Sequence, residues 1–233
     1  ASHLDELDYF PCSCPKCTEA TPKQVLELPL KDRQVFLAEH NLHVCVSELK
    51  HIKQAIRDGR LWEHLEMRTH SHPTLLEALK RLGSFVDFLE KHSSTTKKGG
   101  MFFFDSVGLA RPEVVRHRKK LPERYSPPEG AKTLLLIPQS RMKPFHKSVE
   151  FKQIEKKLKQ QLHKRLVDAH VCFYAAPFGI VPVELDEVYP LSQHETAVPL
   201  DKETIEYVAN QVADYIKRTN YGTVILIDDP KNW

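Results

Sequence analysis

Apolar residues in the first ninety positions recur three and four apart, the spacing of one face of an α-helix. Short helical segments are expected to end at His40-Asn41-Leu42, and Ser47 is then the N-cap of the next helix, with Gly59 as its stop. A further helix is expected to start near Ser71. The pattern predicts an almost wholly helical segment over residues 1–92.

The pattern changes after residue 130. Three continuous apolar runs, Thr133–Ile137, Val171–Ala176 and Thr223–Ile227, have the length and composition of strands buried on both faces. Amphipathic stretches lie between them, the last from about Lys202 to Arg218. Apolar strands that alternate with helices predict an α/β fold, a three-layer sandwich with a mainly parallel sheet.

The stretch between these two regions is mixed. Ser93–Gly100 is polar and ends in two glycines, which is typical of a linker. A short apolar run, Met101–Phe104, is expected to be a buried strand, and the basic stretch Arg111–Arg124 a helix. We therefore expect three parts: a helical segment at 1–92, a linker with a basic helix at 93–130, and an α/β domain at 131–233.

Composition places the chain among ordinary globular proteins, with 41% hydrophobic and 28% charged residues in 233. No apolar run approaches the roughly 20 residues that cross a bilayer, so no membrane is expected. The first residues, Ala1–Leu4, have neither the basic nor the apolar part of a signal peptide. We expect a cytoplasmic protein in a reducing compartment. A net charge of +3 does not by itself identify a partner.

The strongest chemical signal is the stretch Pro11–Cys17, which holds three of the five cysteines within six positions. Zinc prefers four nitrogen or sulfur ligands in a tetrahedron, so a fourth ligand must come from further along the chain. The candidates are His40, His43 and Cys45, of which His40 is favoured. Reduced surface cysteines are the alternative. A closed four-ligand site would make the zinc structural.

Tyr9–Cys17, together with His40-Asn41-Leu42, resembles the zinc site of tRNA-guanine transglycosylases, particularly the archaeal branch that forms archaeosine. The resemblance assigns the four ligands to Cys12, Cys14, Cys17 and His40. It extends through further segments that reach across nearly the whole chain: Ile56–Glu63, Arg111–Arg116, Pro177–Pro182 and Glu184–Leu191.

In that family the zinc site lies near the end of a (β/α)₈ barrel, and the catalytic aspartates precede it. Only eleven residues precede Cys12 here, and the chain stops soon after Ile227, where a C-terminal RNA-binding PUA domain would follow. The resemblance therefore implies the C-terminal part of a transglycosylase, a split subunit or a fragment, with no catalytic residue of its own. Its implied partners are tRNA, an N-terminal catalytic barrel half and a second copy in a dimer. The implied reaction exchanges guanine in tRNA for a 7-deazaguanine precursor of archaeosine.

A paralogous family, archaeosine synthase, transfers lysine to the modified base and carries a Pro-Cys-x-x-x-Lys-Pro-Tyr-x-x-Ser-x-x-His motif after a strand. Pro138–Phe151 resembles this motif, but Gln139, Phe145 and Phe151 replace its cysteine, tyrosine and histidine. Lys143 is then the one remaining group suited to nucleophilic or acid–base chemistry, which argues against lysine transfer. Lysine transfer is kept as one alternative, and a stand-alone RNA-binding or scaffold module as another.

The basic stretch offers candidate contacts to tRNA phosphates, an attraction that would weaken with salt. A solvated helix surface explains such a run equally well. The candidates are Arg111, Arg116, Arg118, Lys119 and Lys120.

Overall fold

The computed structural model describes residues 3–162 and 168–228. The chain divides into two compact units, Ala1–Leu61 and Trp62–Trp233, and each is described by itself. Within the described ranges, no helix is long and apolar enough to cross a membrane. The three parts expected from the sequence, with boundaries at 92 and 130, stay a prediction.

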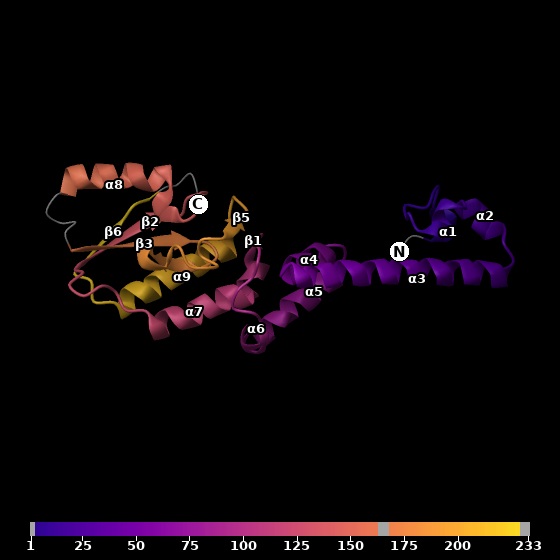
Figure 1. Ribbon diagram of the computed structural model, residues 1–233, viewed down its shortest axis with the longest axis horizontal. Helices are drawn as coiled ribbons and strands as arrows, with labels where there is room; N and C mark the ends of the chain where they lie inside the picture. The colour runs from indigo at the N-terminus through magenta and orange to yellow at the C-terminus, as the bar shows by residue number, and fades with distance from the viewer. Residues whose placement is uncertain (1–2, 163–167, 229–233) are drawn as a thin grey trace. The chain divides into compact units, whose positions relative to one another are not determined.

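Unit 1 is helical, as expected (Figure 1). Its elements are the 3₁₀ turn η1 (Leu4–Glu6) and the helices α1 (Pro15–Thr18), α2 (Pro22–Glu27) and α3 (Leu30–Arg57). The expected break between Leu42 and Ser47 is wrong, because α3 runs through it. No glycine or proline lies inside α3 to end it earlier. The predicted stop is confirmed, since Gly59 follows the helix with φ 69°.

Unit 2 begins with further helices. They are α4 (Leu61–Thr69, which starts at the boundary), α5 (Pro73–Leu82), the 3₁₀ turn η2 (Gly83–Phe85) and α6 (Val86–His92). The helix expected near Ser71 is confirmed as α5, with Pro73 in its first turn and His72 as its N-cap, where the imidazole accepts from the Thr74 amide at 3.3 Å.

The main sheet of unit 2 has the strand order β4-β3-β2-β6. Strand β2 (Thr133–Pro138) pairs in parallel with β3 (Ala169–Ala175) and with β6 (Thr223–Leu226), whereas β4 (Gly179–Pro182) is antiparallel to β3. The helix α8 (Val149–Leu162) covers one face and α9 (Lys202–Arg218) the other (Figure 1). The predicted α/β fold with a mainly parallel sheet is confirmed.

Alternate residues of each central strand supply the two layers of the core. Leu135, Ile137 and Phe173 pack with α8 residues, while Leu134 and Leu136 pack with α9 residues. The close fit of α9 over β4 depends on Gly179, where φ is 78° and an added Cβ would collide with Gln211.

The remaining elements of unit 2 surround this sheet. Strand β1 (Met101–Phe103) confirms the short buried strand and pairs in parallel with β5 (His194–Thr196), which the sequence patterns did not predict. The basic stretch is helix α7, as predicted. The remaining bounds are α7 (Pro112–Arg124), η3 (Ser106–Ala110), η4 (Phe145–Lys147) and η5 (Val183–Leu185).

Candidate functional site

The four residues expected to hold a metal lie together in unit 1. One ligand atom from each of Cys12, Cys14, Cys17 and His40 lies within 4.8 Å of the others. The Nδ1 atom of His40 is 3.2 Å from the Cys17 sulfur and 3.6 Å from the Cys14 sulfur. Neither of the other two candidate fourth ligands belongs to this cluster in the described part of the chain.

Local structure explains how a short loop presents three sulfurs to one histidine. Cys14 is the N-cap of α1, with Pro15 in the first turn, and the Cys14 amide donates to the Cys12 sulfur at 3.4 Å. Two contacts hold this loop on α3. Lys16 forms a 2.7 Å ion pair with Glu39, and the rings of Phe10 and Phe36 lie 5.7 Å apart.

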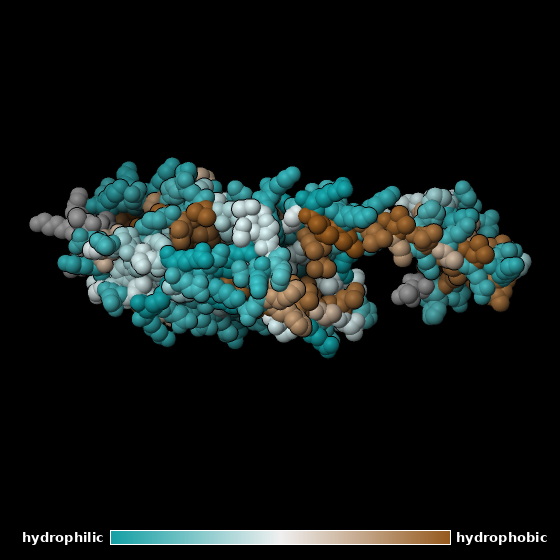
Figure 2. All heavy atoms as spheres, turned by 60° about the horizontal axis from the view of Figure 1, so that its bottom comes forward, coloured by the Kyte–Doolittle hydropathy of each residue, from teal (hydrophilic) through white to brown (hydrophobic). Residues whose placement is uncertain are grey.

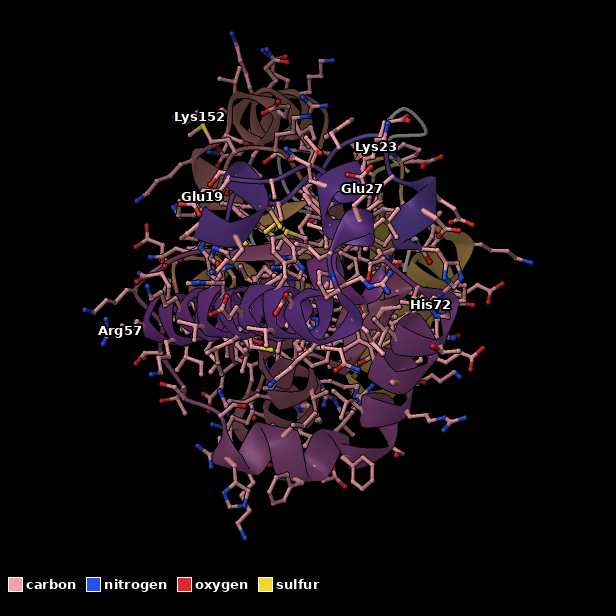
Figure 3. The ribbon with its side chains drawn as sticks, turned by 90° about the vertical axis from the view of Figure 1, so that its right-hand side faces the viewer. Glu19, Lys23, Glu27, Arg57, His72 and Lys152 are labelled. Atoms are coloured by element: carbon pink, nitrogen blue, oxygen red, sulfur yellow. The ribbon has the colours of Figure 1, made fainter. Side chains whose placement is uncertain are left out.

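The cluster is directed inward while charged residues surround it. Cys17 is buried, and the other three members are half-buried. Glu19, which follows α1, and Lys23 and Glu27 of α2 are exposed (Figure 3).

The spacing of the four donors fits a tetrahedral metal ion. A zinc–sulfur bond of about 2.3 Å gives donor–donor edges of roughly 3.5–3.8 Å. The 3.2 and 3.6 Å between His40 Nδ1 and the sulfurs of Cys17 and Cys14 are close to this range. Burial, together with the neighbouring thiols, raises the pKa of Cys17 to about 12. For Cys14, burial opposes ionisation, but hydrogen bonds from the Cys17 backbone and from His40 bring the pKa down to about 6. Crowded thiols thus ionise one at a time unless a cation neutralises them.

Arg111, a candidate tRNA contact, is fully buried in unit 2, which corrects the expectation for this residue. Its guanidinium donates to the Glu63 carboxylate at 2.8 Å and to the Phe102 carbonyl at 2.9 Å, and lies 3.7 Å from Glu113. Its side chain is 1% exposed, so it cannot reach a phosphate in solution. A buried charge requires such partners, and the role of Arg111 is therefore structural.

Two further basic residues of α7 hold α6. Arg116 donates to the Glu90 carboxylate at 2.8 Å. It also donates to the backbone carbonyls of Glu90, Ser93 and Ser94, at and just after the C-terminal end of α6, where carbonyls have no hydrogen-bond partner within the helix. Lys119 forms a 2.6 Å ion pair with Asp87, also on α6. The sequence showed the basic run but gave no sign of these acidic partners.

The other two candidates, Arg118 and Lys120, are half-buried on α7. Neither forms an ion pair with a carboxylate in the described ranges. Figure 2 turns the α7 side of unit 2 forward and shows it as mainly hydrophilic. These two side chains, with the partly exposed Lys119, are what remains of the expected basic surface.

The stretch Pro138–Phe151, which resembles the lysine-transfer motif, begins at the carboxyl end of β2. Lys143 lines a cavity of about 380 Å³ with Gln139, Arg141, Glu195 and neighbouring residues. Burial lowers the pKa of Lys143, and Glu195 partly offsets this. Glu195 comes from β5 and was missed in the sequence, because a three-residue strand leaves no periodic signal.

The residues that replace the motif's reactive groups have structural contacts. The Gln139 side chain accepts a hydrogen bond from the Ala176 amide at 3.1 Å. Phe145 is fully buried, and its ring lies 5.2 Å from that of Phe173. Phe151 also packs on Phe173, at 5.5 Å. None of these three side chains offers a nucleophile or an acid–base group.

Comparison with known families divides the chain in two. Residues 114–230 match the family described as Domain of unknown function (DUF5591), and residues 3–74 match the family described as Queuine tRNA-ribosyltransferase. The second match contains the whole cysteine–histidine cluster.

Individual relatives extend over both parts. The chain is 36% identical over 98% of its length to a tRNA-guanine(15) transglycosylase from Saccharolobus solfataricus, and 38% identical over 93% to one from Methanocaldococcus jannaschii. A protein with the same name from Sulfolobus acidocaldarius is 33% identical over 96% of the chain. The chain spans 44%, 31% and 42% of the lengths of these three relatives.

Proposed function

The chain belongs to the family described as Domain of unknown function (DUF5591), and on that premise we propose that it functions in tRNA modification as the C-terminal part of a tRNA-guanine transglycosylase. The observation that carries this proposal is the identity of more than a third to relatives of that name over nearly the whole chain. The match of residues 3–74 to a tRNA-ribosyltransferase family supports the same assignment.

In this proposal the base exchange is carried out by residues outside these 233. An N-terminal barrel half, as a separate chain or as another segment of a longer one, supplies the nucleophile, and this chain contributes tRNA binding and docking. A second copy forms the dimer that the resemblance implies. Guanine in tRNA is exchanged for a 7-deazaguanine precursor of archaeosine.

Cys12, Cys14, Cys17 and His40 hold a structural zinc in this proposal. Three thiolates and one imidazole fill a tetrahedral shell and leave no position for a reacting water. A bound zinc would join the loop of unit 1 to the N-terminal half of α3 and stabilise the folded state.

The tRNA-binding residues proposed on α7 are now Arg118, Lys119 and Lys120. Arg111 is withdrawn because it is buried, and Arg116 is withdrawn because its donors are held by the end of α6. The three that remain would bind phosphates without regard to sequence.

The experiment that tests the function mixes the purified chain with a chain that carries the transglycosylase barrel, and follows the exchange of labelled guanine into tRNA. Guanine exchange by the mixture, but not by either chain on its own, supports the proposal. If the chain instead transfers lysine to tRNA, and Lys143→Ala abolishes the transfer, the cavity around Lys143 is the active site and the synthase alternative holds. If the chain binds tRNA but shows neither activity in any combination, it is a stand-alone RNA-binding module.

A further inference from the structure

A groove with a mostly apolar wall runs between α7 and the Leu185–Leu191 segment of unit 2. Its volume is about 330 Å³, near the lower end of the roughly 300–1,000 Å³ typical of small-molecule sites. Aromatic and aliphatic side chains from both segments line it: Leu121, Tyr125, Val188, Tyr189, Pro190 and Leu191.

Two cations at the groove have no acidic partner in the part of the chain that the structure describes. Lys120 and Arg124 line the groove, and neither forms an ion pair with any residue in the described ranges. The other charged lining residues are engaged elsewhere, since Arg116 pairs with Glu90, and Glu113 is neutralised by Arg111 and Lys97. The groove therefore combines an apolar wall with unpaired positive charge, which suits an anion attached to a flat apolar group.

A polar atom in the wall also lacks a partner. The Tyr189 hydroxyl is buried without a hydrogen-bond partner among the described residues. Burial, with a further contribution from Glu113, raises the pKa of Tyr189 to about 12, so the hydroxyl stays protonated at neutral pH. A buried hydroxyl without a partner is unfavourable, and a polar edge of a ligand would satisfy it. Tyr125, by contrast, donates to Glu184 at 2.9 Å.

We propose that this groove binds one unpaired nucleotide of an RNA, with the base against Tyr125, Tyr189 and the aliphatic wall and the phosphates on Lys120 and Arg124. That the polyanion is an RNA rests on the proposed function. Proteins recognise single-stranded RNA by laying splayed bases on aromatic side chains beside cations that hold the backbone. A duplex keeps its bases stacked inside and cannot fill an apolar groove of this size.

The first test measures the affinity of the full chain for a tRNA transcript by fluorescence anisotropy at low salt. We expect Lys120→Glu with Arg124→Glu to weaken binding at least tenfold and to lower the slope of log affinity against log salt by about two. The matched control is Lys152→Glu with Lys156→Glu, two exposed lysines of α8, on the other face of the sheet (Lys152 is labelled in Figure 3). The control should change affinity less than about twofold. Equal effects of the two pairs would overturn the proposal.

The second test separates a base site from a patch of charge. A single-stranded RNA hexamer should displace the transcript better than inorganic polyphosphate of equal charge. Tyr189→Phe, which keeps the shape of the side chain, should weaken hexamer binding roughly threefold or more and leave polyphosphate binding unchanged. If polyphosphate competes as well as the hexamer and Tyr189→Phe has no effect, the groove is not a nucleotide site.

The two proposals fail in different ways. If the mixture with the barrel exchanges guanine but the groove variants bind tRNA like the control pair, the groove inference fails and the function stands. If no mixture exchanges guanine while hexamer binding still depends on Lys120, Arg124 and Tyr189, the function fails and the groove stands.

Discussion

The guanidinium of Arg111 donates a 2.8 Å hydrogen bond to the carboxylate of Glu63, 48 residues earlier in the chain. Glu63 and Arg111 belong to two separate segments that carry the family resemblance, Ile56–Glu63 and Arg111–Arg116. Both side chains are almost completely buried. The contact thus fixes α4 to the start of α7 and explains an arginine that the sequence presented as part of a basic surface.

Arg111→Met removes the positive charge and leaves the carboxylates of Glu63 and Glu113 buried without it. We expect a loss of about 3–5 kcal/mol in the free energy of unfolding, the usual result of breaking a buried ion pair. Urea denaturation of the full chain measures this. Lys152→Met, at an exposed position of α8, should change the free energy by less than about 0.5 kcal/mol. A loss below 1 kcal/mol for Arg111→Met would mean that the pair contributes little.

The proposed zinc site predicts one zinc per chain, measured by mass spectrometry of the purified protein. Cys14→Ser should lose the metal and lower the thermal stability of unit 1, because zinc binding supplies folding free energy. Cys45→Ser is the matched control, since Cys45 is an exposed cysteine of α3 outside the cluster. Folded, purified protein with no bound metal, or equal metal content in both variants, would contradict the assignment.

His117 predicts a pH dependence of stability. Its Nε2–H donates to the Ile180 carbonyl at 2.8 Å, and burial lowers its pKa from 6.5 to about 4. Because the unfolded chain binds a proton to this histidine near pH 6.5 and the folded chain does not until about pH 4, stability falls as the pH drops through this window. The expected loss is about 1.4 kcal/mol per pH unit, or roughly 3 kcal/mol in all.

The measurement for His117 is urea denaturation at several pH values between 7 and 4. His117→Gln keeps a donor for the Ile180 carbonyl but does not titrate, so its stability should decline less steeply than that of the natural chain. His43→Gln, at an exposed position of α3, should leave the slope unchanged. Parallel curves for the natural chain and His117→Gln would exclude this source of pH dependence.

The sequence predicted the parts of the fold that depend on burial over a continuous stretch. Thr133–Ile137 is apolar at nearly every position because both faces of β2 are covered, and such a run identifies a central strand. Strand β5 was missed because its three residues include an exposed glutamate and lie in a proline-rich loop. The expected end of a helix at His40–Leu42 was wrong because Ser47, a good N-cap, is also tolerated inside a helix.

The candidate sites also include residues that the sequence could predict and residues that it could not. The cysteine–histidine cluster could be predicted because three of its members lie in one short loop whose spacing is distinctive. Which of the basic residues form ion pairs could not be predicted, because their partners are carboxylates far away in the chain, such as Glu90 for Arg116. A run of lysine and arginine in a sequence indicates positive charge, and only the structure shows which of those charges already form ion pairs.

Guanine exchange tests the central claim most directly. The chain, a chain that carries the transglycosylase barrel, and the mixture of the two are each incubated with tRNA and labelled guanine, and the label retained in tRNA is counted. We expect label only with the mixture, and much less when the Cys14→Ser variant replaces the natural chain. A mixture that forms a stable complex and binds tRNA, yet retains no label above that of the barrel alone, would contradict the proposed function.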